Sequence, residues 1–374
     1  MKTQIEYLVQ FISSLSMLSL FTYVPYWGYL LGFSNLEITL IAIYYGITIL
    51  ITNLIVGRLS DLVGVRKPFI LIGLIITGFS IPFLGLQTNF VIFSGIRIIT
   101  AIGYGIYLPT LIALVTDKKM KLGKFSGYGT AAWAVGVVIS GIIGVFWVPG
   151  LFIFSGIVVL GSFIIAITIK EEKSFNKKYE FSTLVVYMKR KRIFTAFIIR
   201  HSLASAIWAL WPIYLASLGA NEFSVALIQV LNPVTSSLIM NKFTDLLDSK
   251  LMVNLGLLIS GITFFGYLLA DNWIFILPVQ ILLGFSWAFI FVGVLRYGIE
   301  SSEFDRSTVS GLVNSIQSIS VILGSFLAFV IVYFNGSIAD IILFACLGSL
   351  ITFVVNYALD IKMHSSRVLV SKTL

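Results

Sequence analysis

Twelve long apolar segments, separated by short polar breaks, constrain what this chain can fold into more than any other feature. Each has about the 20 residues that a helix needs to cross the hydrocarbon core of a bilayer. Only 11% of the 374 residues are charged, whereas soluble domains carry about 25%. The sequence therefore predicts an all-α polytopic membrane protein with 12 transmembrane helices, at about 7–31, 37–57, 68–87, 91–115, 125–146, 149–169, 193–218, 223–241, 251–270, 273–297, 307–334 and 338–360.

Lysines and arginines outside these segments keep to alternate breaks. One set of breaks is basic, near Arg66, Lys121, Lys250 and Arg306, over 170–192, and in both tails. The other set contains no Lys or Arg, near Ser34, Thr88, Pro149, Asn221, Asp271 and Gly336. Because positive residues stay on the cytoplasmic side of short loops, we expect both termini in the cytoplasm and a multi-pass protein of the plasma membrane. The net charge of +9 then reflects topology and does not indicate a nucleic-acid partner.

The two halves of the chain repeat each other. PYWGYLLGFSNLEITLI at 25–41 resembles PIYLASLGANEFSVALI at 212–228, and GRLSDLVGVRK at 57–67 resembles NKFTDLLDSKL at 241–251. The offsets agree within a few residues, as a true internal repeat requires. A six-helix unit repeated in parallel is typical of one large class of transporters. We therefore expect an N-terminal six-helix bundle, a cytoplasmic linker and a C-terminal six-helix bundle, at 1–172, 173–192 and 193–374.

Two local patterns resemble signatures of the major facilitator superfamily. The loop between the second and third helices of that family is similar to Gly57-x-Leu59-Ser60-Asp61-x-x-Gly64-x-Arg66-Lys67, with departures at Leu62 and Val65. The family's fourth-helix signature is similar to Arg97-x-x-Thr100-Ala101-x-Gly103-x-Gly105, with Thr and Ala where Gln and Gly are common. The resemblance implies a secondary transporter whose two bundles enclose a central solute site, opened alternately to each side. The loop pattern is most similar to the drug and metabolite efflux branch.

The charged loop is a candidate cytoplasmic latch. Asp61 is close enough in sequence to Arg66 and Lys67 to pair with them across the turn that Gly64 permits. Gly57 lies at the end of a predicted span, where a missing side chain allows close helix approach. The resemblance implies that such an ionic latch holds the cytoplasmic side closed in one conformation, with Asp245 as the matching residue of the second half. The alternative is a positive-inside turn without a gating role.

Three ionisable residues lie inside predicted spans. Arg97 is about two turns into the fourth span, and Arg200 and His201 are similarly deep in the seventh. Charges at such depths are costly and usually face a cavity or a partner, so all three are candidates for substrate binding or ion coupling. Two alternatives stay open. Arg200 can snorkel to the cytoplasmic face, and His201 can be a hydrogen-bonded packing residue.

Polar and aromatic residues at helical spacing suggest cavity walls. Hydrogen-bonding groups combined with aromatic rings suit a neutral or anionic organic solute, whereas the alternative is hydrogen bonding between helices. The candidates that complete the binding set are Tyr45, Trp208, Gln229, Asn232, Gln280, Asn314 and Gln317.

Function classes other than transport lack support in the sequence. No hydrolase, zinc-protease or nucleotide-binding motif occurs, so we expect no enzyme activity, and a membrane enzyme is the remote alternative. One cysteine and two histidines predict no metal and no cofactor. We expect a monomeric exporter of a small organic solute in the lipid bilayer, working by alternating access, with protons as a candidate coupling ion. The alternative is a sugar or organic-anion facilitator or symporter in which Arg97 and Arg200 bind the anion.

Overall fold

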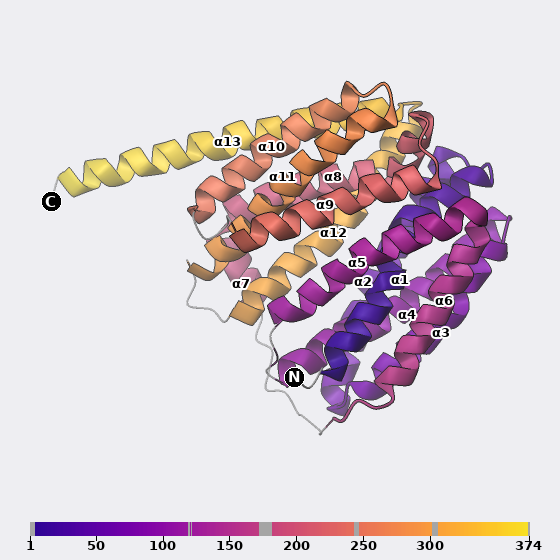
Figure 1. Ribbon diagram of the computed structural model, residues 1–374. Helices are drawn as coiled ribbons and strands as arrows, with labels where there is room; N and C mark the ends of the chain where they lie inside the picture. The colour runs from indigo at the N-terminus through magenta and orange to yellow at the C-terminus, as the bar shows by residue number, and fades with distance from the viewer. Residues whose placement is uncertain are drawn as a thin grey trace. The chain divides into compact units, whose positions relative to one another are not determined.

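The computed structural model describes residues 4–118, 120, 122–171, 182–242, 247–300 and 306–372. Thirteen helices and no strand occur in these ranges (Figure 1). Twelve of the helices are long and apolar enough to cross a membrane, which confirms the predicted fold class. The helices are α1 (Ile5–Leu30), α2 (Asn35–Val63), α3 (Lys67–Leu86), α4 (Phe90–Asp117), α5 (Leu122–Phe146), α6 (Val148–Ala166), α7 (Ser182–Lys189), α8 (Lys191–Ser217), α9 (Glu222–Lys242), α10 (Ser249–Leu268), α11 (Trp273–Glu300), α12 (Arg306–Tyr333) and α13 (Ile338–Lys372).

Helix ends are defined by local chemistry rather than by the limits of the apolar runs. Ser34 and Glu37 form a reciprocal capping box at the start of α2, which satisfies two backbone N–H groups that have no partner within the helix. Gly64 ends α2 in the left-handed region at φ 73°, where a glycine costs little. The stretch GRLSDLVGVRKP therefore forms the last two turns of α2, a tight turn and the start of α3.

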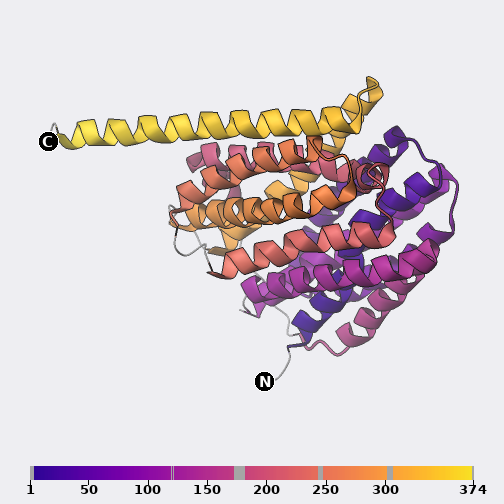
Figure 2. The same ribbon diagram turned by 45° about the horizontal axis from the view of Figure 1, so that its top comes forward.

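Two helices differ most from the predicted spans. The short helix α7 lies in the expected linker, where the Tyr187 hydroxyl is 3.0 Å from the Thr195 hydroxyl of α8. Helix α13 continues to Lys372, well beyond the predicted end at 360. In both ribbon views it runs past the end of its neighbour α10 (Figure 2).

The described contacts divide the chain into two compact units. The first comprises Met1–Tyr179 and Ala209–Pro233, and the second comprises Glu180–Trp208 and Val234–Leu374. Helices α8 and α9 thus each contribute one part to each unit. The bundle limits inferred from the repeat stay a prediction.

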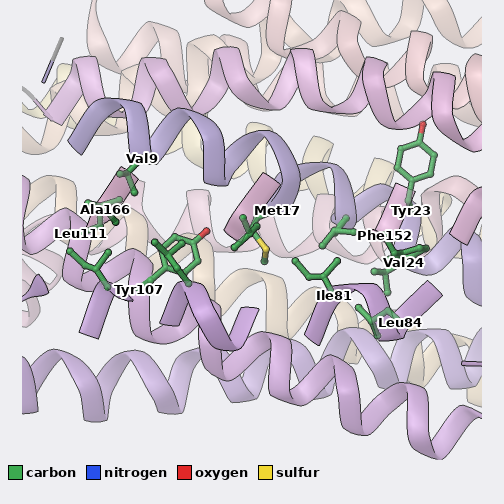
Figure 3. Packing of buried hydrophobic residues seen from close by; sticks show 14 of the residues in the cluster. Val9, Met17, Tyr23, Val24, Ile81, Leu84, Tyr107, Leu111, Phe152 and Ala166 are labelled. Atoms are coloured by element: carbon green, nitrogen blue, oxygen red, sulfur yellow. The ribbon is translucent and has the colours of Figure 1, made fainter. Parts of the chain in front are cut away.

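The third helix of each repeat packs on the fourth and the sixth. In the first unit α3 packs on α4 and α6, and in the second unit α10 packs on α11 and α13. A row of buried side chains fills the first unit, with Met17 between a group around Tyr107 and a group around Phe152 (Figure 3). Phe194, Val253 and Ile290 belong to the corresponding core of the second unit. The contacts of the third helix thus recur in both units.

Candidate functional site

The loop between α2 and α3 holds a buried arginine. Arg66 is only 2% exposed, although it lies in a polar break. Its Nε donates to Asp117 Oδ2 at 3.2 Å, and its Nη1 donates to the Ser60 hydroxyl at 2.7 Å. Asp117 ends α4 and Ser60 lies in the last turns of α2. The guanidinium therefore ties the ends of two helices to the start of a third.

Glu171 stabilises the other side of this loop. Its two carboxylate oxygens accept the backbone N–H groups of Arg66 and Lys67, at 2.5 and 2.8 Å. A carboxylate at a helix N-terminus is favourable because it satisfies free N–H groups and complements the helix dipole. Nearby, Lys118 pairs with Glu6 of α1. These partners lie about 50 to 110 positions apart in sequence, which is why local spacing did not indicate them.

Three of the predicted latch residues need separate comment. The side chain of Asp61 and all of Asp245 lie outside the described residues. The close helix approach expected at Gly57 is not seen, because no described atom lies within 4 Å of the position that a Cβ would take there. The structure does bring Arg66 and Lys67 together, since both bind Glu171.

Arg97 lies in α4 and is 4% exposed. Its guanidinium carbon is 3.7 Å from the centre of the Tyr45 ring of α2. Tyr45 in turn stacks on Tyr104 at 6.5 Å and meets the edge of Phe21 at 5.6 Å. Arg97 Nε, Arg97 Nη1 and the Tyr45 hydroxyl are all buried, and none has a hydrogen-bond partner among the described residues.

The described residues around Arg97 do not fully offset the cost of burying its positive charge. Aromatic faces attract a cation by about 2 kcal/mol or more when water is excluded, but removing an ion from water costs several kcal/mol. The three unpartnered groups are N–H or O–H donors. The arrangement is therefore complementary to an acceptor-rich, negatively charged group.

Asn53 helps to hold α2 against α4 beside this site. Pro109 has no N–H, so the carbonyl of Gly105 loses its helical donor. In the amide orientation that gives both its oxygen and its nitrogen suitable partners, the side-chain nitrogen of Asn53 in α2 donates to this carbonyl at 2.9 Å. This contact positions the helix face that carries Tyr45, and sequence reasoning missed it.

Arg200 of α8 is buried rather than snorkelling. It is 2% exposed, and its Nε and Nη2 donate to the hydroxyls of Ser260 and Ser286 at 2.7 and 3.1 Å. Its guanidinium carbon lies 5.9 Å from the Phe264 ring centre and 5.8 Å from that of Trp287. The snorkelling interpretation is wrong, because neutral hydroxyls and aromatic faces hold this charge inside the second unit.

His201 follows Arg200 and packs against two rings that also contact each other. Its ring centre is 5.6 Å from that of Phe197 and 5.3 Å from that of Trp287. Its Nδ1 is buried without a hydrogen-bond partner among the described residues. Packing is thus established for His201, and a role in binding stays a prediction.

Of the polar and aromatic candidates, Tyr45 lies against Arg97, and others have hydrogen-bond partners of their own. Gln229 accepts the indole N–H of Trp211 at 3.1 Å, and Gln280 accepts the Tyr267 hydroxyl at 3.1 Å. These bonds fit the alternative of hydrogen bonding between helices. Asn232 is buried, Trp208 and Gln317 are half-buried, and the side chain of Asn314 lies outside the described part of the chain.

The family model described as Major Facilitator Superfamily matches residues 7–325. The chain belongs to the major facilitator superfamily. It is therefore a multi-pass membrane transporter of small solutes rather than an enzyme.

Solved structures of other transporters share the superfamily fold with this chain. The nucleoside transporter NupG has a TM-score of 0.75 at 14% identity, over 95% of this chain and 98% of that one. A POT family transporter in complex with 5-aminolevulinic acid has a TM-score of 0.76 at 11% identity, over 96% and 95% of the two chains. A comparison with curated proteins found no match to this chain.

In this transporter, the Arg66 contacts predict a measurable loss of stability on mutation. Arg66→Met should lower the free energy of unfolding by about 3 kcal/mol, because Asp117 and Ser60 would lose their bonds to the buried guanidinium. The chain's single cysteine, Cys346, is buried. Thermal unfolding of purified protein can therefore be followed by the exposure of this thiol to a fluorogenic maleimide.

Arg58→Met is the matched control for Arg66→Met, since Arg58 is exposed and lies six residues before Gly64 within the same loop signature. We expect the control to unfold at the wild-type temperature. Equal unfolding temperatures for the two variants would contradict a stabilising role of the Arg66 contacts.

Proposed function

We propose that this superfamily member transports a small organic solute that carries an anionic group, by alternating access across the plasma membrane. The observation that carries the proposal is Arg97. It is buried on the face of Tyr45 with Nε and Nη1 unpartnered among the described residues. A carboxylate or phosphate is the group that best satisfies such donors, since charge-assisted hydrogen bonds to guanidinium are the strong ones.

The acidic residues support an anionic rather than a cationic solute. Every Asp and Glu whose side chain is described lies at an end of a candidate span or outside the spans, and none lies in the middle of one. A cationic solute would need a carboxylate inside the membrane to offset its charge. Arg200 is a second buried cation, in the other unit, and serves as a further candidate for anion binding.

A gating role for the basic loop is part of the proposal. Arg66 and Asp117 form a buried ion pair, and Asp61, Gly64, Lys67 and Asp245 are the other members proposed for the latch. Alternating access needs contacts that bias one of two conformations. A pair at the end of α4 that also binds α2 and α3 is suited to that task.

Flux into proteoliposomes tests the proposed substrate class. The panel contains acidic solutes, with 5-aminolevulinic acid and simple carboxylates first, and neutral solutes, with nucleosides first. We expect saturable flux of an acidic solute that other carboxylates inhibit. Saturable flux restricted to neutral or cationic solutes would contradict the anionic class.

The same vesicles decide coupling and direction. Flux is compared with and without an imposed pH gradient, in both orientations of the solute gradient. Faster solute flux under the imposed pH gradient supports proton coupling. Outward flux that is faster than inward flux supports export. Flux that follows only the gradient of the solute itself identifies a facilitator.

A further inference from the structure

The linker helix α7 lies next to the start of a membrane span. It ends at Lys189, and a single turn residue separates it from α8, whose candidate span begins at Lys191. Met188 is three residues before Lys191, so the two residues lie within about 11 Å of each other even in an extended chain. Lipid headgroups form a layer several ångströms deep outside the hydrocarbon core. Helix α7 is therefore close to the depth of the headgroups.

One face of α7 is anchored to the second unit. The Tyr187 ring stacks on that of Phe194 with 6.3 Å between ring centres, and its hydroxyl is 3.0 Å from that of Thr195. The turn after α7 contains Arg190, whose guanidinium carbon lies 5.5 Å from the centre of the Tyr297 ring of α11. The helix also packs on α12. These contacts leave another face of α7 directed away from the unit.

The outward face of α7 is apolar. Val185 is 45% exposed and Met188 is 58% exposed. Residues three apart are neighbours on the surface of a helix, so these two side chains form one apolar patch. A short amphipathic helix beside the start of a span is suited to lie in the membrane interface, with its apolar side chains at the boundary of headgroups and acyl chains. Lipid would cover both side chains there.

A run of four basic residues, Lys189–Arg192, follows the apolar patch. Arg192 pairs with Asp360 of α13, with 2.5 Å between Nη2 and Oδ1. Lys189 and Lys191 are exposed, and no acidic residue occurs in the sequence from the start of α7 to the end of α8. Four to eight basic residues immediately cytoplasmic of a span are typical of a site for anionic lipid. The charge pattern predicts that this side is the cytoplasmic one.

We infer that α7 binds anionic phospholipid of the inner leaflet through a lipid-binding surface made of Val185, Met188, Lys189 and Lys191. The two apolar side chains contact the upper acyl chains, and the two ammonium groups bind the phosphates of the headgroups. An acidic soluble protein would match the charges but not the position, because the surface adjoins a membrane span. Lipid binding of this kind fixes the linker between the two repeats at the membrane, whatever solute is transported.

Fluorescence quenching in the full-length protein tests the lipid-binding surface. Met188→Cys in a Cys346→Ser background is labelled with a maleimide dye and placed in nanodiscs, either of phosphatidylcholine alone or of an equal mixture of phosphatidylcholine and phosphatidylglycerol. Both kinds of nanodisc contain the same small fraction of phosphatidylcholine with a nitroxide on its upper acyl chain. We expect the nitroxide to quench the dye at least about twofold more in the mixture, because anionic headgroups attract the two lysines beside the dye.

Two controls separate this surface from a general effect of lipid charge. The same dye on Lys170→Cys, at an exposed residue just beyond α6, should be quenched equally in the two nanodiscs. In the Met188→Cys protein, Lys189→Gln combined with Lys191→Gln should abolish the difference between nanodiscs. Arg58→Gln combined with Lys170→Gln removes the same charge from exposed residues on the same predicted side, and should preserve that difference.

Equal quenching of the Met188→Cys dye in the two nanodiscs would overturn the assignment of anionic lipid to α7. So would a difference that persists after both lysines are replaced, or one that the control pair of substitutions also removes. A dye that the nitroxide does not quench, while iodide in the buffer does, would place this face of α7 in water. None of these measurements needs a transported solute, so their outcome is independent of the proposed substrate class.

Discussion

Replacing Arg97 with glutamine should reduce kcat/KM for the acidic solute at least about 100-fold, equivalent to about 2.8 kcal/mol. Glutamine keeps a hydrogen-bonding end but loses the charge and most donors of the guanidinium. The protein should still fold, because Arg97 Nε and Nη1 make no hydrogen bond to a described residue and Tyr45 loses only a stacking partner. Initial rates of flux into proteoliposomes measure the effect.

Two comparisons separate anion binding from a structural effect of Arg97. Arg97→Lys retains the charge but not the planar guanidinium that stacks on Tyr45, so we expect an intermediate loss of about tenfold. The unfolding temperature, read from exposure of Cys346, should be unchanged in Arg97→Gln. Wild-type flux in folded Arg97→Gln would rule out Arg97 as the anion partner.

The fold could be predicted from the sequence because the bilayer leaves few choices. A chain that crosses hydrocarbon must satisfy every backbone N–H and C=O within its own segment, so a long apolar run becomes a helix. Helix ends follow different rules. The Ser34–Glu37 capping box sets the start of α2 and Gly64 sets its end, and a hydropathy pattern indicates neither feature. For the same reason the continuation of α13 to Lys372 was not predicted.

Only the charged residues of the site could be predicted from the sequence. The cost of burying a cation made Arg97 and Arg200 stand out, and both are buried. Their surroundings were beyond the sequence. Tyr45 was predicted as a cavity wall and not as the ring under Arg97, and the serines that bind Arg200 gave no sign of that role. Contacts between distant segments depend on helix rotation and depth, which an apolar run leaves undetermined.

The loop signature shows the same limit. The spacing of Asp61, Arg66 and Lys67 suggested a pair across one turn, whereas the described partners of Arg66 include Asp117 of α4 and Glu171 beyond α6. A turn at the membrane edge meets the ends of several helices at once. Its partners are therefore set by packing of the whole unit and not by neighbours in sequence.

Replacing Gly136 with alanine should destabilise the protein by about 3 kcal/mol, because overpacking against rigid backbone forces helices apart. A Cβ at Gly136 of α5 would lie 1.8 Å from the carbonyl oxygen of Leu15 in α1. No change of rotamer can relieve this clash, since the opposing atom belongs to the backbone. Close approach of this kind is the reason for small residues at helix contacts in membranes. The temperature at which Cys346 becomes reactive measures the loss.

Gly127→Ala provides the matched comparison within α5. No described atom lies within 4 Å of its Cβ position, and alanine favours a helix interior over glycine by about 1 kcal/mol. We therefore expect Gly127→Ala to unfold at or above the wild-type temperature, while Gly136→Ala unfolds well below it. An unfolding temperature for Gly136→Ala equal to that of Gly127→Ala would mean that α1 and α5 can separate at little cost.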